Sequence, residues 1–378
     1  MEMPIGVQVE DREIGRHRGE AAGPTLIAVA GIHGNEPAGL EAARRVFARL
    51  SRGDLRFRGE LVVFAGNLRG LRRGVRYHDR DLNRAWTEER VAGLKSKPAA
   101  DWDTEDHEQA ELLHSIEEAA ARARGQLFLA DFHTTSAAGI PFILFGDTLR
   151  QRHFAQVFPL PILLGLEEQL DGVLTGYWTK RGFVTFALEG GQHKAPDSVD
   201  AVEAVLWLSL SRAGLLLDKP AELARSAELL DRRRAGLPRV VEVVSRRSIT
   251  PDDEFVMEPG FRNIDHARKG QLLARDTGGE IRADEDGLVV LPLYQGLGGD
   301  GYFWGREMSA ARLRTSEMLR LSGAGKLLGL LPGVHRDGSR FVADARSARP
   351  LSLSVLQLMG YRRVRQEGSR LTIARCTS

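Results

Sequence analysis

The sequence predicts an α/β fold: a mixed, largely parallel β-sheet flanked by helices, followed by a second, β-rich domain toward the C-terminus. Apolar runs of strand length alternate with segments whose apolar residues recur every three or four positions, the spacing of one helix face. This alternation stops near residue 235, where short apolar runs lie among Gly, Asp and Asn turns. At 378 residues the chain is long enough for two hydrophobic cores.

The first strand is expected at residues 24–30, because this apolar run ends in a glycine-rich turn. Pro37 then opens a segment in which Leu40, Ala43 and Phe47 step by three and four residues, so a helix follows the turn. The next elements are a strand at 61–65, a helix at 105–124 and a strand at 127–133. Further strands are expected at 142–145, 161–164 and 183–188, followed by a long apolar helix that Ser198 caps.

Residues 1–235 are therefore expected to form the first domain, and residues 236–305 a β-rich domain with strands at 240–244 and 288–294. Residues 306–378 read as a C-terminal extension of unknown role. Its expected elements are helices at 310–321 and 352–359 and a strand at 370–374.

Charge and composition exclude several classes of partner. The net charge of +2, from 53 basic and 51 acidic residues, creates no global field that favours nucleic acid or an anionic membrane. No apolar run approaches the roughly 18 residues of a membrane span, and residues 1–15 lack the core of a signal peptide. The lone Cys376 has no disulfide partner, as in a reducing compartment. We expect a cytoplasmic protein without nucleic-acid or membrane partners; a homo-oligomer stays open.

Three side chains at the ends of two expected strands form a candidate metal site. His33 and Glu36 lie three residues apart in the turn after the first strand, and His133 ends the strand at 127–133. Catalytic zinc sites join two closely spaced ligands to a distant third and leave one position to water, whereas structural sites have four ligands, usually including cysteine. One cysteine in the chain excludes the structural kind, so we expect one zinc ion per chain.

Asp131 precedes His133 by two residues, so both side chains face the same side of an extended strand. Two interpretations stay open. Asp131 either supports the metal-binding histidine through a hydrogen bond or is a buried structural aspartate.

Four motifs together resemble the succinylglutamate desuccinylase and aspartoacylase family, whose members are relatives of the zinc carboxypeptidases. The motifs are GIHGNE at 31–36, RYHDRDLNR at 76–84, DFH at 131–133 and LEG at 188–190. The resemblance extends over residues 20–305 and implies a zinc carboxypeptidase-like fold for the first domain, with the β-rich domain covering the active site.

The resemblance also implies roles for individual residues. Asp81 would support His33 through a hydrogen bond, while Asn83 and Arg84 would hold a substrate carboxylate. Arg76 would polarise the scissile carbonyl, and Glu189, at the end of a strand, would be the general base.

The family uses a further arginine before the catalytic glutamate and a tyrosine from the second domain. Arg181 and Tyr302 are the nearest candidates in this sequence. The glycine-rich segment at 296–301 follows a strand but opens no helix, which excludes a dinucleotide site and indicates a turn at the mouth of the pocket.

The sequence thus predicts a zinc-dependent amidohydrolase that removes an acyl group from an N-acyl amino acid or a similar small carboxylated amide. A metallocarboxypeptidase acting on peptides needs the same residues, but the expected covering domain favours small substrates. A non-catalytic metal- or ligand-binding protein would not need Glu189 as a base. The acyl group, the amine portion and the oligomeric state are left open.

Overall fold

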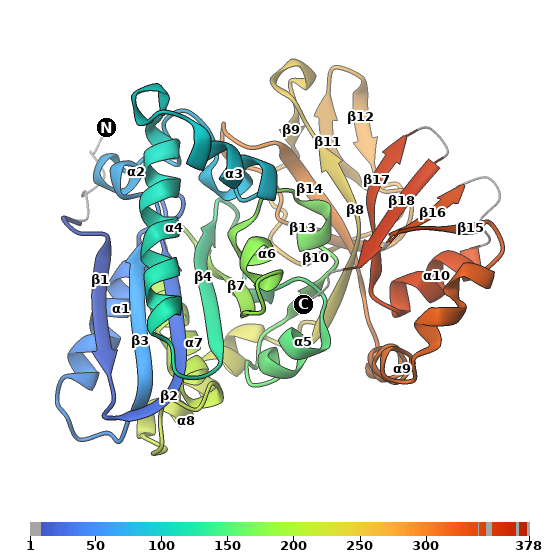
Figure 1. The fold of residues 1–378 in the computed structure, drawn as a ribbon. Coiled ribbons are helices and arrows are strands. Elements are labelled where there is room, and N and C mark those ends of the chain that lie inside the picture. The colour runs from blue at the N-terminus through green and yellow to red at the C-terminus, as the bar shows by residue number, and fades with distance from the viewer. Residues whose placement is uncertain (1–8, 339, 345–349, 368–369, 376–378) are drawn as a thin grey trace.

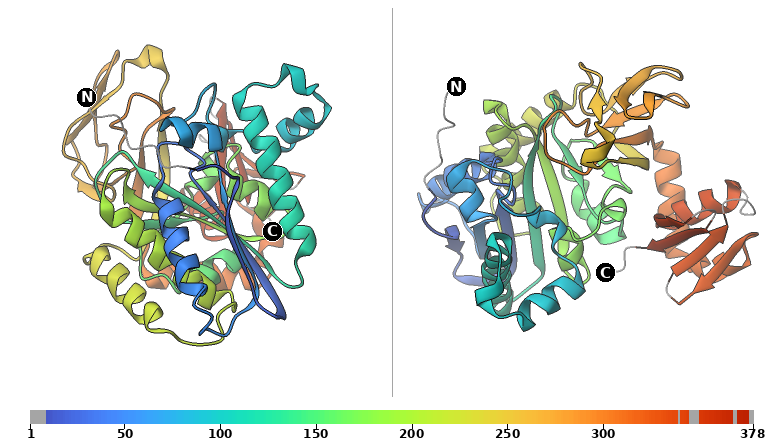
Figure 2. Two further views of the ribbon diagram at one scale, coloured as in Figure 1. Left: turned by 90° about the vertical axis from the view of Figure 1, so that its left-hand side faces the viewer. Right: turned by 90° about the horizontal axis from the view of Figure 1, so that it is seen from above.

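The computed structural model describes residues 9–338, 340–344, 350–367 and 370–375, so Cys376 lies outside the described part. A large twisted sheet carries helices on both faces, and a smaller lobe lies at one end (Figures 1 and 2). The α-helices are α1 (Ala38–Leu50), α2 (Leu68–Arg73), α3 (Glu88–Ser96), α4 (Thr104–Arg122), α5 (Leu149–Ala155), α6 (Leu174–Thr179), α7 (Pro196–Arg212), α8 (Ala221–Arg234), α9 (Ala310–Leu321) and α10 (Pro350–Leu358).

The large sheet has the strand order β1-β3-β2-β4-β7-β5-β6-β8-β14-β13-β10. Its strands are β1 (Glu13–Arg18), β2 (Ala21–Ala30), β3 (Arg58–Ala65), β4 (Leu127–Thr135), β5 (Phe142–Leu144), β6 (Ile162–Leu164), β7 (Val184–Gln192), β8 (Val240–Ser248), β10 (Asp265–Ala267), β13 (Gly287–Val290) and β14 (Asp300–Glu307). Strands β3, β2, β4 and β7 run parallel to one another. The predicted fold class is confirmed.

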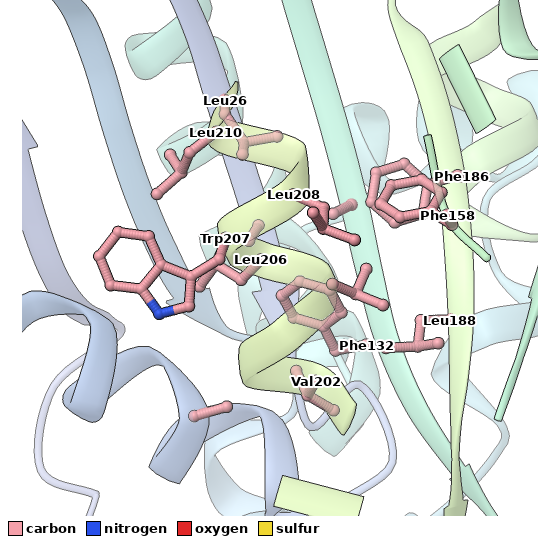
Figure 3. Close-up of a cluster of buried hydrophobic side chains, with 14 of the residues drawn as sticks. Leu26, Phe132, Phe158, Phe186, Leu188, Val202, Leu206, Trp207, Leu208 and Leu210 are labelled. Atoms are coloured by element: carbon pink, nitrogen blue, oxygen red, sulfur yellow. The ribbon is translucent and has the colours of Figure 1, made fainter. Parts of the chain in front are cut away.

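Alternating side chains of the parallel strands build two cores, one on each face of the sheet. On β2, Leu26 and Ala28 pack in the cluster that includes apolar residues of α1, α7 and α8, whereas Ile27 and Val29 pack in the cluster of α3, α4 and α6. Figure 3 shows α7 lying across the sheet, with Trp207 1% exposed. Truncating one such large buried side chain to alanine costs about 2–5 kcal/mol, so this packing holds the strands that carry the site.

The start of α7 differs from the expectation. Ser198 does not cap the helix, which begins two residues earlier at Pro196 with Ala195 as its N-cap. Proline suits the first helical position because its fixed φ angle is already helical and it lacks an N–H that would stay unpaired there. The Ser198 hydroxyl instead donates to the carbonyl of Gln192 (2.7 Å), tying the helix to the end of β7.

The β-rich segment continues the large sheet instead of starting a new one. Strand β8 pairs in parallel with β6 and antiparallel with β14. The same sheet therefore contains strands from both sides of the boundary expected between residues 235 and 236. The strand expected at 288–294 ends at Val290. A small separate sheet is formed by β9 (Val256–Met257), β11 (Leu272–Asp276) and β12 (Gly279–Arg282).

The C-terminal lobe consists of α9, α10 and a four-stranded sheet of order β15-β16-β18-β17. These strands are β15 (Val334–Asp337), β16 (Arg340–Asp344), β17 (Tyr361–Glu367) and β18 (Arg370–Arg375). The lobe has its own apolar cluster, which includes Leu328, Phe341 and Leu356. The three elements expected here are confirmed. No helix in the described part of the chain is long and apolar enough to span a bilayer.

A buried ion cluster joins the C-terminal lobe to the rest of the molecule. The Asp147 carboxylate, before α5, accepts hydrogen bonds from Arg152 (2.6 and 2.9 Å) and from Arg320 of α9 (2.7 and 3.2 Å). All three residues are at most 8% exposed. Since a buried charge is costly without its partners, removal of one cation leaves Asp147 undercompensated.

We therefore predict that Arg320→Ala destabilises the protein by about 3–5 kcal/mol, measured by urea unfolding. Arg314→Ala is the matched control, because Arg314 lies on the same helix but is exposed. If the two variants unfold at the same urea concentration, the ion cluster does not stabilise the attachment of the lobe.

Candidate metal centre and active site

The turn after β2 brings His33 and Glu36 to the carboxyl end of the parallel strands. Gly31 has φ +71°, a conformation that side-chain-bearing residues rarely adopt. A Cβ on Gly34 would lie 2.1 Å from the carbonyl carbon of Gly70, so the turn can approach α2 only with glycine at position 34. The turn is thus shaped by close backbone packing, and both functional side chains point back toward the sheet.

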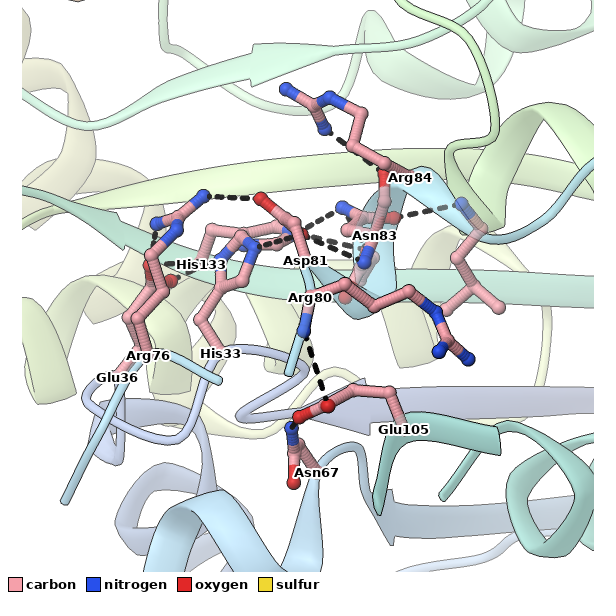
Figure 4. Close-up of polar contacts among 12 residues, drawn as sticks. His33, Glu36, Asn67, Arg76, Arg80, Asp81, Asn83, Arg84, Glu105 and His133 are labelled. Atoms are coloured by element: carbon pink, nitrogen blue, oxygen red, sulfur yellow. Dashed lines mark hydrogen bonds and ion pairs between the residues drawn. The ribbon is translucent and has the colours of Figure 1, made fainter. Parts of the chain in front are cut away.

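His33, Glu36 and His133 form one buried group whose ligand atoms all lie within 4.8 Å of one another. The Nδ1 atom of His33 lies 3.0 Å from Oε1 of Glu36, and the Nδ1 atom of His133 lies 3.2 Å from Oε2 (Figure 4). All three residues are at most 5% exposed. The structure brings together the three residues expected to bind a metal.

A second carboxylate lies behind each imidazole. His33 Nε2 is 2.9 Å from Oδ1 of Asp81, and His133 Nε2 is 2.9 Å from Oδ2 of Asp131. A histidine that donates through one ring nitrogen to a carboxylate presents a more basic nitrogen on the other side, the arrangement found behind metal-bound histidines. The two Nδ1 atoms, which face the Glu36 carboxylate, are therefore the nitrogens available to coordinate a metal.

The charges in this group are unbalanced in a way that suits a divalent cation. Glu36, Asp81, Asp131 and Glu189 supply four carboxylates, and the guanidinium of Arg76 contacts two of them, Glu36 and Asp81. Burial alone lowers the pKa of His133, but Asp131 and Glu36 raise it well above its usual value. Two imidazole nitrogens and a carboxylate are also ligands that zinc prefers. The residues present fit such a metal.

Glu189 lies next to this group because β4 and β7 are neighbours, with Glu189 opposite His133 in the strand register. Its Oε2 atom is buried and has no hydrogen-bond partner among the described residues. Burial raises the pKa of Glu189 to about 8, while the charge of His133 lowers it and that of Glu36 raises it. A nearby dication would favour the ionised form of this carboxyl group.

Arg76 reaches the same end of the cavity from the loop at 74–81. Its guanidinium donates to Oδ2 of Asp81 (3.0 Å) and lies 3.5 Å from Oε1 of Glu36. Although burial lowers the pKa of Arg76, Asp81 and Glu36 raise it above its ordinary value, so the group stays charged.

Glu105, which sequence reasoning missed, holds this loop in place from α4. Its carboxylate, 0% exposed, accepts the backbone N–H groups of His78 and Asp79 (both 2.8 Å) and the side chain of Asn67 (Figure 4). Glutamates on an amphipathic helix usually face solvent, so helical spacing gave no signal for this role.

The two residues expected to bind a carboxylate, Asn83 and Arg84, both line the cavity and have different partners. Asn83 is engaged internally: its amide nitrogen lies 3.2 Å from His133 Nε2, and its oxygen accepts the N–H of Leu174 (2.8 Å). Arg84 lines the cavity and is 3.3 Å from Oδ2 of Asp300, which Arg246 also contacts. Arg84 already faces a carboxylate, the kind of group it was expected to recognise.

The site lies in a cavity of about 610 Å³. It is lined by His33, Glu36 and His133 and by residues of the segment 291–300 of the β-rich part, including the glycine-rich turn. Arg181 and Tyr302 are not among the lining residues. Arg181 pairs with Glu88 (2.8 Å) and stacks on Tyr177, and Tyr302 packs near Phe255.

The cavity also contains residues that the sequence did not single out. His193 directly follows β7 and comes four residues after Glu189. Its Nδ1 lies 2.7 Å from the Thr134 hydroxyl oxygen, and burial lowers its pKa. Arg246, Asp300 and Glu167 come from distant segments. Only His193 had a sequence signal, its closeness to Glu189.

Comparisons with known proteins agree with this geometry. The model of the succinylglutamate desuccinylase/aspartoacylase catalytic domain matches residues 22–202. A succinylglutamate desuccinylase from Burkholderia pseudomallei is 32% identical over 265 residues, which cover 67% of this chain and 70% of that protein. One from Pseudomonas fluorescens is 42% identical over 62 residues, which span 16% of this chain and 18% of that protein. The crystal structure of a succinylglutamate desuccinylase/aspartoacylase from Rhodobacter sphaeroides has a TM-score of 0.56 at 17% identity, over 78% of this chain and 88% of that one, and shows the shared fold.

Proposed function

Because the chain belongs to the succinylglutamate desuccinylase/aspartoacylase family of deacylases, we propose that it is a zinc-dependent amidohydrolase. Its substrate would be an N-acyl amino acid or a similar small carboxylated amide. The observation that carries this proposal is the Glu189 carboxyl group, whose buried Oε2 has no hydrogen-bond partner among the described residues, beside the group of His33, Glu36 and His133. Binding a metal would not require such a base.

In this proposal, one group of residues binds the metal and Glu189 transfers the proton. His33, Glu36 and His133 would hold the metal, which when bound would polarise the acyl carbonyl and lower the pKa of a water molecule. Glu189 takes a proton from the water that adds to the carbonyl carbon. When the C–N bond breaks, Glu189 returns that proton to the leaving amine, so protons balance over the cycle.

Arg76 and Arg84 would act on different parts of the substrate. The Arg76 guanidinium lies at the metal end of the cavity, where it stabilises negative charge on the carbonyl oxygen during the addition. Arg84 would bind the substrate carboxylate and align the amide. Asn83, which also lines the cavity, would keep His133 and the loop in position.

The size of the cavity supports small substrates over peptides. Residues of the segment 291–300 line it together with His33, Glu36 and His133, and a volume of about 610 Å³ suits a single small molecule. A metallocarboxypeptidase would instead need a groove open at the side where the peptide continues.

A screen of N-acetyl and N-succinyl amino acids with the zinc-loaded protein tests the proposal. We predict hydrolysis of at least one of them, and Glu189→Gln should lower its turnover by about 10²–10⁴-fold while the variant keeps its zinc, because Glu189 moves protons and does not bind the ion. Metal analysis of both proteins supplies the control. Unchanged turnover in Glu189→Gln would assign the base to another residue.

The role of Arg84 predicts discrimination between a substrate and its carboxamide. Replacement of the substrate carboxylate by a neutral amide should remove its ion pair with Arg84 and lower kcat/KM by about tenfold to a hundredfold. Arg84→Lys should also be damaging, because an ammonium group cannot form two parallel hydrogen bonds with a carboxylate.

Arg76→Lys serves as the contrasting variant, since a residue that acts on the transition state should affect kcat more than KM. Equal kcat/KM for acid and amide in the wild-type protein, and again in Arg84→Ala, would contradict the role of Arg84.

A further inference from the structure

The C-terminal lobe exposes large apolar side chains that take no part in its own core or in the cavity. Met318 and Leu321 lie on α9 and are each 71% exposed, while Leu327 and Leu330, on the 3₁₀ helix that follows (Ala324–Leu330), are 62% and 80% exposed. Four of the nine exposed large hydrophobic side chains in the described part of the chain therefore fall within this short segment. We call these four side chains the apolar lobe surface.

The spacing of these residues places each pair on one side of its helix. Residues three apart share a face of an α-helix and eclipse one another in a 3₁₀ helix, so Met318 adjoins Leu321 and Leu327 adjoins Leu330. The two helices contact each other, and α9 lies at the lower end of the lobe in Figure 1. Leu328 packs inward, in the apolar cluster of the lobe. The segment therefore presents apolar side chains outward as well as inward, where a helix exposed only to water would present polar ones.

The lobe also concentrates positive charge. Residues 310–378 include 13 Lys and Arg against 4 Asp and Glu, a net charge of +9, whereas residues 1–309 have a net charge of −7. The overall charge of +2, from which no membrane partner was expected, therefore does not describe the lobe. A charge separation of this kind orients the lobe toward a negatively charged surface.

Exposed cations lie next to the apolar lobe surface. Arg314 comes one helical turn before Met318, and Lys326 directly precedes Leu327. Both cations are exposed and form no ion pair within the part of the chain that the structure describes, and Glu317 is an exposed acidic residue beside them. Cations beside protruding Leu and Met side chains suit the interface of a bilayer, where the cations meet anionic headgroups and the apolar groups enter the acyl boundary.

The two features together favour a lipid surface over other partners. Nucleic acid would be bound by the same cations through its phosphates, but exposed Leu and Met side chains would gain nothing from that contact. A second copy of the lobe would bring one net charge of +9 against another. A bilayer with anionic lipids is the surface that uses both the charge and the apolar side chains.

We propose that the apolar lobe surface and its flanking cations dock the protein onto membranes that contain anionic phospholipids. The docking is peripheral: the apolar side chains enter the interface, and the chain does not cross the bilayer. None of these residues lines the cavity, so the inference goes beyond the proposed deacylase function and does not depend on it.

Sedimentation of the protein with lipid vesicles tests this proposal. Vesicles of phosphatidylcholine with phosphatidylglycerol should bind it, and their affinity should fall as the salt concentration rises. Vesicles of phosphatidylcholine alone should bind it at least about tenfold more weakly, because they lack the net negative charge. Equal binding to the two kinds of vesicle, or binding to neither, would overturn the proposal.

Two variants separate the apolar and the charged contributions, and urea unfolding checks that each is folded. The double variant Leu321→Ser/Leu330→Ser should bind phosphatidylglycerol vesicles on the order of tenfold to a hundredfold more weakly, because two apolar side chains no longer enter the bilayer. Leu217→Ser is its control, since Leu217 is exposed outside the lobe. Lys326→Glu should lower affinity by on the order of tenfold, with the exposed Lys219→Glu as control. Unweakened binding by the double serine variant would overturn the proposal.

The same variants detect the other occupants of this surface. If the protein binds an oligonucleotide as tightly as the anionic vesicles, and Lys326→Glu weakens both while the double serine variant weakens neither, the lobe is a nucleic-acid site and the proposal fails. Sedimentation velocity without vesicles tests for a second copy. A dimer that the double serine variant dissociates would place another chain on the apolar lobe surface and would also contradict the proposal.

Discussion

The cost of burying negative charge is the constraint on which this site depends. Glu36 lies between two imidazoles, each of which has a further carboxylate behind it, and Glu189 adds another at the same end of the sheet. Burial alone would raise the pKa of Glu36, yet His33 and His133 hold it well below its usual value. The group therefore needs positive charge in its middle, and a divalent cation meets that need with the ligands that the chain supplies.

The parallel arrangement of the strands brings these charged side chains together. Parallel strands end at the same edge of a sheet, so the turns after β2 and β4 and the end of β7 meet there. Two apolar cores hold the strands in register from both faces. The loop with Arg76 and Asp81 is also held from α4, because the Glu105 carboxylate accepts the backbone N–H groups of His78 and Asp79. A buried side chain of α4 thus helps to position two charged residues of the site.

The predictable part of the structure was the part set by local pattern. Apolar runs that end in His33–Glu36 and His133 indicated both the strands and the grouping of these three side chains, because neighbouring parallel strands bring their ends together. Arg181 and Tyr302 were chosen by closeness in sequence, but the direction of a side chain near an element end depends on tertiary packing, and neither lines the cavity. Glu105 and Asp300 contact segments far away in the chain, for which one sequence contains no signal. Ser198 failed as a cap because Pro196 starts the helix earlier.

The most direct test of this account is to identify the ion between His33, Glu36 and His133 in a crystal of the protein purified without chelator. Diffraction data on both sides of the zinc absorption edge should give an anomalous peak within bonding distance of the two Nδ1 atoms and the Glu36 carboxylate, about 2.0–2.2 Å from each. Glu189 should lie near the peak without coordinating it. An empty site in zinc-soaked crystals, with Glu36 still hydrogen-bonded to both imidazoles, would contradict the claim that this buried charge serves to bind a metal.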